Sequence, residues 1–187
     1  MRVLILYFTR EGQTGRIADK IAARLIEASH AVECRDGNSQ SAGFDLAAYD
    51  AVIVGASIHY GHHSLAAHLW AFRHRKMLAT KPGAFFSVSL TGGGPGARPL
   101  VAQKYLNAYL SRTRWQPQLT AIFGGALPYS RYTPFTRQLV RMFVRMAGGD
   151  TDASRDYEYT DWGAVEDFAD RFLGSLKAPE SADFATG

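Results

Sequence analysis

The sequence has almost no cysteine and no long hydrophobic segment. Its single cysteine, Cys34, allows neither an intramolecular disulfide framework nor a cysteine-rich metal site, which fits a reducing compartment. The apolar run at residues 3–8 is too short for the core of a signal peptide and far below the roughly 20 residues of a membrane span. We therefore expect a protein that is cytosolic or attached peripherally to a membrane.

An excess of acidic residues is also missing. The chain carries 21 Lys and Arg against 17 Asp and Glu, a formal net charge of +4. This balance favours an anionic partner, such as a membrane surface, a nucleic acid or an acidic small molecule. With 187 residues, 47% of them hydrophobic, the chain suffices for one globular domain. We predict that domain at residues 1–175, followed by a flexible tail at 176–187.

Hydrophobic runs without polar alternation recur along the chain. Runs at residues 3–8, 51–56, 84–90 and 119–123 indicate strands buried on both faces, and a weaker strand is expected at 30–35. Helical patterns separate them, which predicts an α/β fold. We expect a doubly wound parallel sheet of five strands in the order 2-1-3-4-5, with ligands bound beyond the carboxyl ends of the strands.

Amphipathic helices are expected between these strands and after the last one. The final helix is expected to follow Thr160 or Asp161, either of which can cap its N-terminus. The residues expected to face the sheet are Ile17, Ile21, Leu25 and Ile26 in the first helix, Leu65, Leu69 and Phe72 in the second, and Leu100, Tyr105, Leu106 and Tyr109 in the third.

The segment between the first strand and the first helix predicts a phosphate site. It consists of Thr9, Arg10, Glu11, Gly12, Gln13 and Thr14. Backbone N–H groups and the positive end of the helix dipole face a bound anion at such a place. Threonine hydroxyls and the Gln13 amide can donate further hydrogen bonds. Because the Gly-Lys-Ser/Thr ending and the spaced glycines of other nucleotide loops are missing, the pattern favours a mononucleotide phosphate. A threonine-rich helix cap without a ligand is the alternative.

Two further segments end at the same edge of the predicted sheet, where they could wall a flat ring system. The cluster of four histidines that begins at His59 suggests a metal site or a mere helix start as alternatives, but it contains no carboxylate and no cysteine, so we predict no metal. The expected wall residues are Ser57, Ile58, His59, Tyr60 and Gly61 after the third strand, and Ser87, Val88, Ser89 and Leu90 after the fourth.

Residues 124–159 are too long for an ordinary connection of about 2 to 6 residues, so we predict an insertion after the fifth strand. A basic amphipathic helix within it can lie in a membrane interface or hold an acidic substrate. Packing on the domain with solvated arginines is the alternative, and nucleic-acid binding is not expected. Its apolar face consists of Phe135, Leu139, Met142, Phe143 and Met146, and its basic face of Arg137, Arg141 and Arg145.

Several motifs resemble those of known flavoproteins. Residues 6–14, LYFTREGQT, resemble the FMN phosphate signature of flavodoxins, and residues 49–57 resemble their third strand. Residues 124–132, 146–152 and 159–162, together with GASIHYGH at 55–62, are similar to the menaquinone-dependent protoporphyrinogen IX dehydrogenases. These form a long-chain flavodoxin-like family of bacterial haem synthesis. The likeness extends over residues 1–173.

This resemblance implies FMN as cofactor and the oxidation of protoporphyrinogen IX to protoporphyrin IX. It also implies menaquinone or another membrane quinone as electron acceptor, and a peripheral place on the cytoplasmic side of the inner membrane. Arg131, Arg137 and Arg141 are candidates for the substrate's propionates, and Arg145 for the substrate or the membrane. No catalytic side chain carries over. A flavodoxin-type electron carrier and an FMN quinone reductase stay as alternatives, and the glycine-rich segment 92–98 departs from the family pattern.

Overall fold

The computed structural model describes residues 1–39 and 45–177. Its central sheet contains five parallel strands, in the order β2-β1-β3-β5-β6, which confirms the predicted fold class and strand order. A short strand, β4 (His62–His63), pairs antiparallel with β3. The parallel strands are β1 (Arg2–Phe8), β2 (Ala31–Asp36), β3 (Ala51–His59), β5 (Gly83–Ser89) and β6 (Leu119–Gly124).

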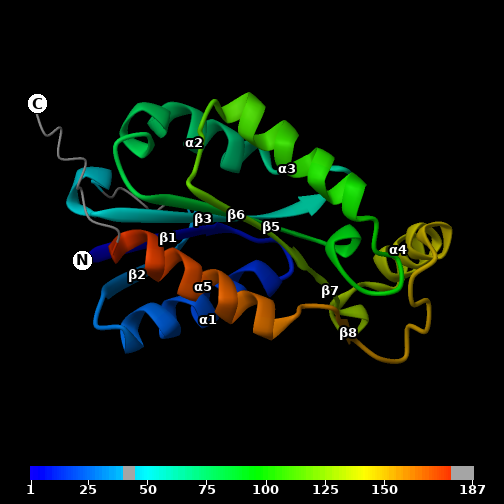
Figure 1. The fold of residues 1–187 in the computed structure, drawn as a ribbon. Helices are drawn as coiled ribbons and strands as arrows, with labels where there is room; N and C mark the ends of the chain where they lie inside the picture. Colours follow the sequence, from blue (N-terminus) through cyan, green and yellow to red (C-terminus); the bar gives the residue numbers. More distant parts are fainter. Residues whose placement is uncertain (40–44, 178–187) are drawn as a thin grey trace, which may run out of the picture.

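Helices cover both faces of this sheet (Figure 1). One face packs against α1 (Gln13–Glu27) and α5 (Trp162–Lys177), the other against α2 (Leu65–Leu78) and α3 (Pro99–Thr113). Neighbouring residues of a strand point to opposite faces, so Ile5 joins the core on the first side and Leu6 the core on the second. The nearly unbroken apolar runs of the sequence follow from this burial on both faces.

The predicted buried face of the second helix is wrong. The face of α2 that packs on the sheet contains alanines in place of the predicted large apolar residues. Ala67 and Ala71 are fully buried. The Tyr109 hydroxyl of α3 donates a hydrogen bond to the Ala67 carbonyl (3.2 Å), and such a close approach suits a small side chain. The apolar residues that lie at the surface instead are Leu65, Leu69 and Phe72 of α2, together with Ile26 of α1 and Leu100 of α3.

The insertion forms a small unit of its own beyond the carboxyl ends of the strands (Figure 1). Its two short strands pair antiparallel and so bring its beginning and end together. Leu127, Tyr129 and Val144 form its buried core. The elements are β7 (Ala126–Leu127), a 3-10 turn η3 (Tyr129–Arg131), α4 (Pro134–Ala147) and β8 (Tyr157–Glu158).

Two shorter 3-10 turns, η1 (Leu46–Ala48) and η2 (Leu90–Gly92), complete the connections. At the start of α5 the Asp161 carboxylate accepts from the Ala164 N–H (3.1 Å), as one of the two predicted caps. Leu176 still belongs to α5, and most of the predicted tail, 178–187, lies outside the described residues. Among residues 1–39 and 45–177 no helix is long and apolar enough to cross a bilayer.

Candidate functional site

The loop between β1 and α1 has the form of an anion site. Gly12 adopts φ +97°, a left-handed conformation that turns the chain into the helix. The Gly12 N–H donates to the Thr9 hydroxyl oxygen (3.0 Å), which holds the loop closed. In the described chain no side chain caps α1 and no acidic residue stands in its first turn. The N–H groups of that turn can therefore serve a bound anion.

The Thr14 hydroxyl is the second sign of a ligand. It is fully buried and, among the described residues, has no hydrogen-bond partner. Leaving a buried hydroxyl unpaired costs about 1 to 3 kcal/mol, which a phosphate oxygen at this position would offset. The Gln13 amide donates one hydrogen bond to the Thr160 hydroxyl (2.7 Å) and so links the loop to the start of α5. Thr14 and the helix start fit a cofactor phosphate.

A cleft of about 1060 Å³ opens beside this loop, and a narrower space of about 40 Å³ adjoins it at the sheet. Pockets for one small ligand span roughly 300 to 1,000 Å³, so the cleft has room for a cofactor with a second molecule. Nearly all predicted wall and loop residues line one or both spaces: Thr9, Arg10, Glu11, Gly12, Gln13, Thr14, Ser57, Ile58, His59, Tyr60, Gly61, Val88, Ser89 and Leu90.

The Ser87 side chain lies elsewhere. Its hydroxyl is hydrogen-bonded to Nε2 of His63 (2.9 Å) on the side of the sheet that α2 and α3 cover. The alternation of side chains along β5 sends it there with Phe85. His63 is almost fully buried, and this burial lowers its pKa to about 3. The imidazole is therefore neutral and belongs to the core beneath the cleft.

The segment after the third strand is a hairpin. β3 continues to His59, and only Tyr60 and Gly61 connect it to β4. Both turn residues have positive φ angles, 53° and 84°, as a tight two-residue hairpin turn requires. Tyr60 stands at the tip, 72% exposed, with the Arg10 guanidinium 5.8 Å from its ring centre. It can reach across the mouth of the cleft.

His59 is the half-buried titratable group of this hairpin. Its Nε2 lies 3.2 Å from the Ser57 hydroxyl, which in turn donates to the Phe8 carbonyl (3.3 Å). Burial lowers the pKa of His59, so the imidazole is neutral near pH 7 and can donate or accept a hydrogen bond inside the cleft.

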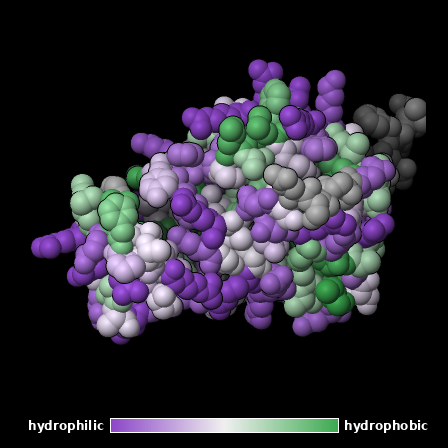
Figure 2. Space-filling model, turned by 180° about the vertical axis from the view of Figure 1, so that it is seen from behind, coloured by the Kyte–Doolittle hydropathy of each residue, from purple (hydrophilic) through white to green (hydrophobic). Residues whose placement is uncertain are grey.

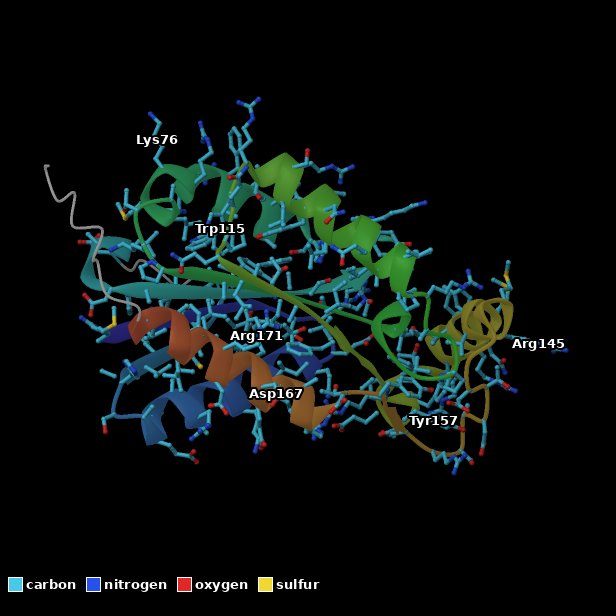
Figure 3. All side chains as sticks on the ribbon, viewed as in Figure 1. Lys76, Trp115, Arg145, Tyr157, Asp167 and Arg171 are labelled. Carbon is cyan, nitrogen blue, oxygen red and sulfur yellow. The ribbon has the colours of Figure 1, made fainter. Side chains whose placement is uncertain are left out.

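The four arginines predicted to contact substrate or membrane have different positions. Arg131 lines the cleft. Arg137 and Arg141 face the body of the insertion: Nε of Arg137 donates to the Tyr129 carbonyl (3.2 Å), and Nε of Arg141 to the Thr151 carbonyl (3.1 Å). Arg145 is exposed and points away from the molecule (Figure 3). In the structure Arg137 and Arg141 thus hydrogen-bond to carbonyls of the insertion itself, and their contact with propionates stays a prediction.

The apolar face of α4 points outward. Phe135, Met142 and Met146 are 79%, 50% and 75% exposed, while Val144 on the opposite side is buried. Figure 2 shows hydrophobic side chains exposed among hydrophilic neighbours at the α4 end of the molecule, at the left of that view. These three residues do not pack on the domain. Leu139 is partly buried and the Phe143 side chain lies outside the described part of the structure, so a helix packed on the domain through those two residues stays an alternative.

Sequence reasoning missed the cleft residues that come from α3 and the insertion. Val140 and Val144, four residues apart on α4, share the inward side with Arg137 and Arg141, and this spacing was the available signal. The hydropathy pattern instead emphasised the larger residues of the outer face. The missed lining residues include Tyr105, Leu127, Pro128, Tyr132, Thr136, Val140 and Val144.

Fold and site together define a flavodoxin-like protein. Residues 4–154 match the family model described as flavodoxin domain. Oxidised flavodoxin 1 of Bacillus cereus has a TM-score of 0.57 at 17% identity, covering 95% of this chain and 100% of that one. Flavodoxin 2 of the same organism has a TM-score of 0.57 at 20% identity, covering 94% and 99%. The domain family confirms FMN as the predicted cofactor.

Relatives with higher identity narrow this class. Protoporphyrinogen IX dehydrogenase [quinone] of Leishmania major is 39% identical over 175 residues, which cover 91% of this chain and 74% of that protein. The protein of the same name from Escherichia coli (strain K12) is 36% identical over 173 residues, covering 90% and 93%. The chain therefore belongs to the protoporphyrinogen IX dehydrogenase [quinone] family, as the motifs predicted.

Proposed function

We propose that the protein oxidises protoporphyrinogen IX to protoporphyrin IX in haem biosynthesis, with menaquinone or another membrane quinone as electron acceptor. Bound FMN would supply the redox chemistry, as acceptor of the hydrogen removed from the macrocycle. One observation carries the proposal: the insertion turns the cofactor edge into a cleft of about 1060 Å³. An electron carrier needs only an exposed flavin edge, whereas a substrate enzyme needs a walled space that positions the reacting carbon.

The chain's own residues divide the work. The start of α1 and Thr14 hold the phosphate, and the hairpin with His59 and Tyr60 walls the ring on one side. Leu127, Val140 and Val144 present an apolar wall from the insertion, which suits a macrocycle and excludes water. With its neutral imidazole, His59 is our candidate to accept or relay a proton in the cleft.

The test is an anaerobic reduction of the FMN-loaded protein. Protoporphyrinogen IX is expected to bleach the flavin absorbance, and a soluble menaquinone analogue to restore it, with protoporphyrin fluorescence rising in step. The E. coli relative serves as a positive control. A flavin that stays oxidised with porphyrinogen but is reduced by a flavodoxin reductase would establish an electron carrier. Reduction by NAD(P)H alone would establish a quinone reductase.

We further propose that the protein binds peripherally to the cytoplasmic face of the inner membrane through α4. The exposed Phe135 and Met146 would enter the acyl boundary, and the outward Arg145 would meet anionic head groups. We expect Phe135→Ser with Met146→Ser to reduce co-sedimentation with anionic liposomes at least tenfold. Ile26→Ser, which removes a 56% exposed residue from α1, is the matched control. Equal binding of both variants would exclude this contact.

A further inference from the structure

We infer that Arg131 binds the phosphate of the cofactor, so that the insertion supplies a cation to the phosphate loop, whose own Arg10 lies by the Tyr60 ring. The sequence had suggested a substrate propionate as the partner of this residue. The inference rests on FMN as the cofactor but not on the identity of the substrate. It also assigns the insertion a second role, because the same segment that walls the cleft then takes part in holding the cofactor.

The position of the Arg131 guanidinium carries the inference. Its Nη1 donates to the carbonyl of Glu11 (3.3 Å), a residue of the phosphate loop 120 positions away in the chain. The same nitrogen lies 3.7 Å from the place that a Cβ on Gly12 would take. Arginine has five N–H donors in a planar fork that matches phosphate oxygens, and this contact occupies one of them. The others remain near the start of α1.

The other arginines near the loop interact with other side chains. The Arg10 guanidinium lies by the Tyr60 ring at the hairpin tip. Arg16 donates to the Gln13 side-chain oxygen (3.0 Å) and pairs with Glu158 (2.5 Å). Arg131, in contrast, has no ion pair within 4.0 Å among residues 1–39 and 45–177.

Two carboxylates stand near Arg131, and both have other partners. Asp156 accepts hydrogen bonds from the backbone N–H (2.8 Å) and the hydroxyl (2.6 Å) of Ser130. Those bonds, and then the charge of Arg131, lower the pKa of Asp156. Glu11 is next to Tyr132, whose pKa is raised by burial and then by the Glu11 carboxylate. An arginine close to the loop and without its own carboxylate fits a dianionic phosphate.

This arrangement links cofactor binding to the docking of the insertion. Arg131 ends η3, whose turn is closed by the Arg131 N–H donating to the Pro128 carbonyl (2.9 Å) and is anchored by the fully buried Tyr129. A phosphate that holds Arg131 therefore also holds η3 against the loop. By linkage, FMN must stabilise the docked insertion by as much as the docked insertion strengthens FMN binding.

Comparing FMN with riboflavin, which lacks the phosphate, tests the inference. Binding of each to the full-length apoprotein is measured by flavin fluorescence quenching. We expect Arg131→Gln to weaken FMN binding at least tenfold and riboflavin binding less than twofold, with Arg131→Lys in between. Arg145→Gln, an exposed arginine of the same insertion, is the matched control and should change neither. Retained riboflavin binding also shows that the variant is folded.

Equal losses for both flavins would overturn the inference in favour of a purely structural arginine, and unchanged FMN binding would overturn it outright. Limited trypsin digestion gives an independent readout, since α4 carries three cleavable arginines. FMN should slow cleavage there more than riboflavin does, and Arg131→Gln should abolish the difference; equal protection by both flavins in the unmodified protein would contradict the linkage. Neither measurement contains porphyrinogen, so failure of the proposed activity would leave these results standing.

Discussion

The phosphate loop and the insertion face each other across one cleft, but different interactions hold them. The loop follows a strand and precedes a helix that are both buried in the main core, with Phe8 2% and Ile17 0% exposed. Its geometry comes from the backbone. The insertion has a small core of its own and is fixed by side chains, such as the Tyr129 hydroxyl that donates to the Asp150 carbonyl (2.9 Å). Single side chains should therefore matter more in the insertion.

The largest effect is expected from removing the insertion. The Tyr159 N–H donates to the Gly125 carbonyl (2.9 Å), so a two-residue turn can replace residues 126–158 without stretching the chain. Porphyrinogen oxidation should fall roughly 100-fold or more because one wall of the cleft is lost and the substrate is no longer positioned. Riboflavin binding, which depends on the sheet edge and the hairpin rather than on the insertion, should change only a few-fold. Turnover at the original rate would break the comparison, because it would show that the insertion does not position the substrate.

A smaller loss is expected where the insertion leaves the sheet. A Cβ at Gly124 would lie 2.1 Å from the Tyr159 carbonyl oxygen, a backbone atom that must move to make room. Gly124→Ala should therefore reduce the free energy of unfolding by about 3 kcal/mol in urea titrations. Gly174→Ala, with nothing within 4 Å of its Cβ in α5, should instead add up to about 1 kcal/mol. Equal effects of the two substitutions would show that the backbone around Gly124 can move aside at little cost in stability.

The buried His63, which lies beneath the cleft, predicts that the stability of the protein depends on pH. His63 has a pKa of about 3 in the folded protein, against about 6.5 in an unfolded chain. Between these values only the unfolded chain binds the proton, so stability is lost as the pH falls below about 6.5. From pH 7 to pH 5 the loss should be about 2 kcal/mol larger in the unmodified protein than in His63→Gln, measured by urea unfolding. Equal losses of stability in the unmodified protein and in the variant would show that another group causes the acid sensitivity.

The two regions also differ in how far the sequence predicted them. The sheet and the phosphate loop were predictable because buried parallel strands and the turn from β1 into α1 leave local patterns in the sequence. Even the order of the strands was predicted correctly. The side-chain direction of Ser87 was missed because the sequence did not show which face of β5 its hydroxyl would take. The outward face of α2 was missed because large residues outweigh Ala67 and Ala71 in a hydropathy pattern.

In the insertion the helix was predictable but its orientation was not. The periodicity of α4 separates apolar from basic residues, yet it cannot say which side meets the domain. Tertiary contacts decide this: Arg137 and Arg141 find carbonyl acceptors on the inside, and Val144 fills the small core. Contacts with residues distant in sequence also place Arg131 on the phosphate loop, which no local pattern indicates.

The smallest predicted effect decides between the two roles considered for Arg137. Its guanidinium donates to the carbonyls of Tyr129 (3.2 Å) and Tyr132 (3.4 Å) from the first half of α4. Arg137→Gln should therefore cost about 1 kcal/mol of local stability. Hydrogen exchange should show this as several-fold faster exchange confined to α4 and η3. Arg145→Gln, which removes an equal charge from the outer side, should leave the exchange unchanged.

A propionate role for Arg137 makes the opposite prediction, because an arginine that binds substrate need not brace the free protein. The KM for protoporphyrinogen would then rise in Arg137→Gln while exchange in α4 stayed as in the unmodified protein. With the bracing role, a rise in KM should accompany the faster exchange. A second substitution, Arg137→Lys, keeps the charge but loses the fork that reaches both carbonyls, so it should behave like Arg137→Gln in exchange. Charge alone would then be insufficient to hold the insertion in place.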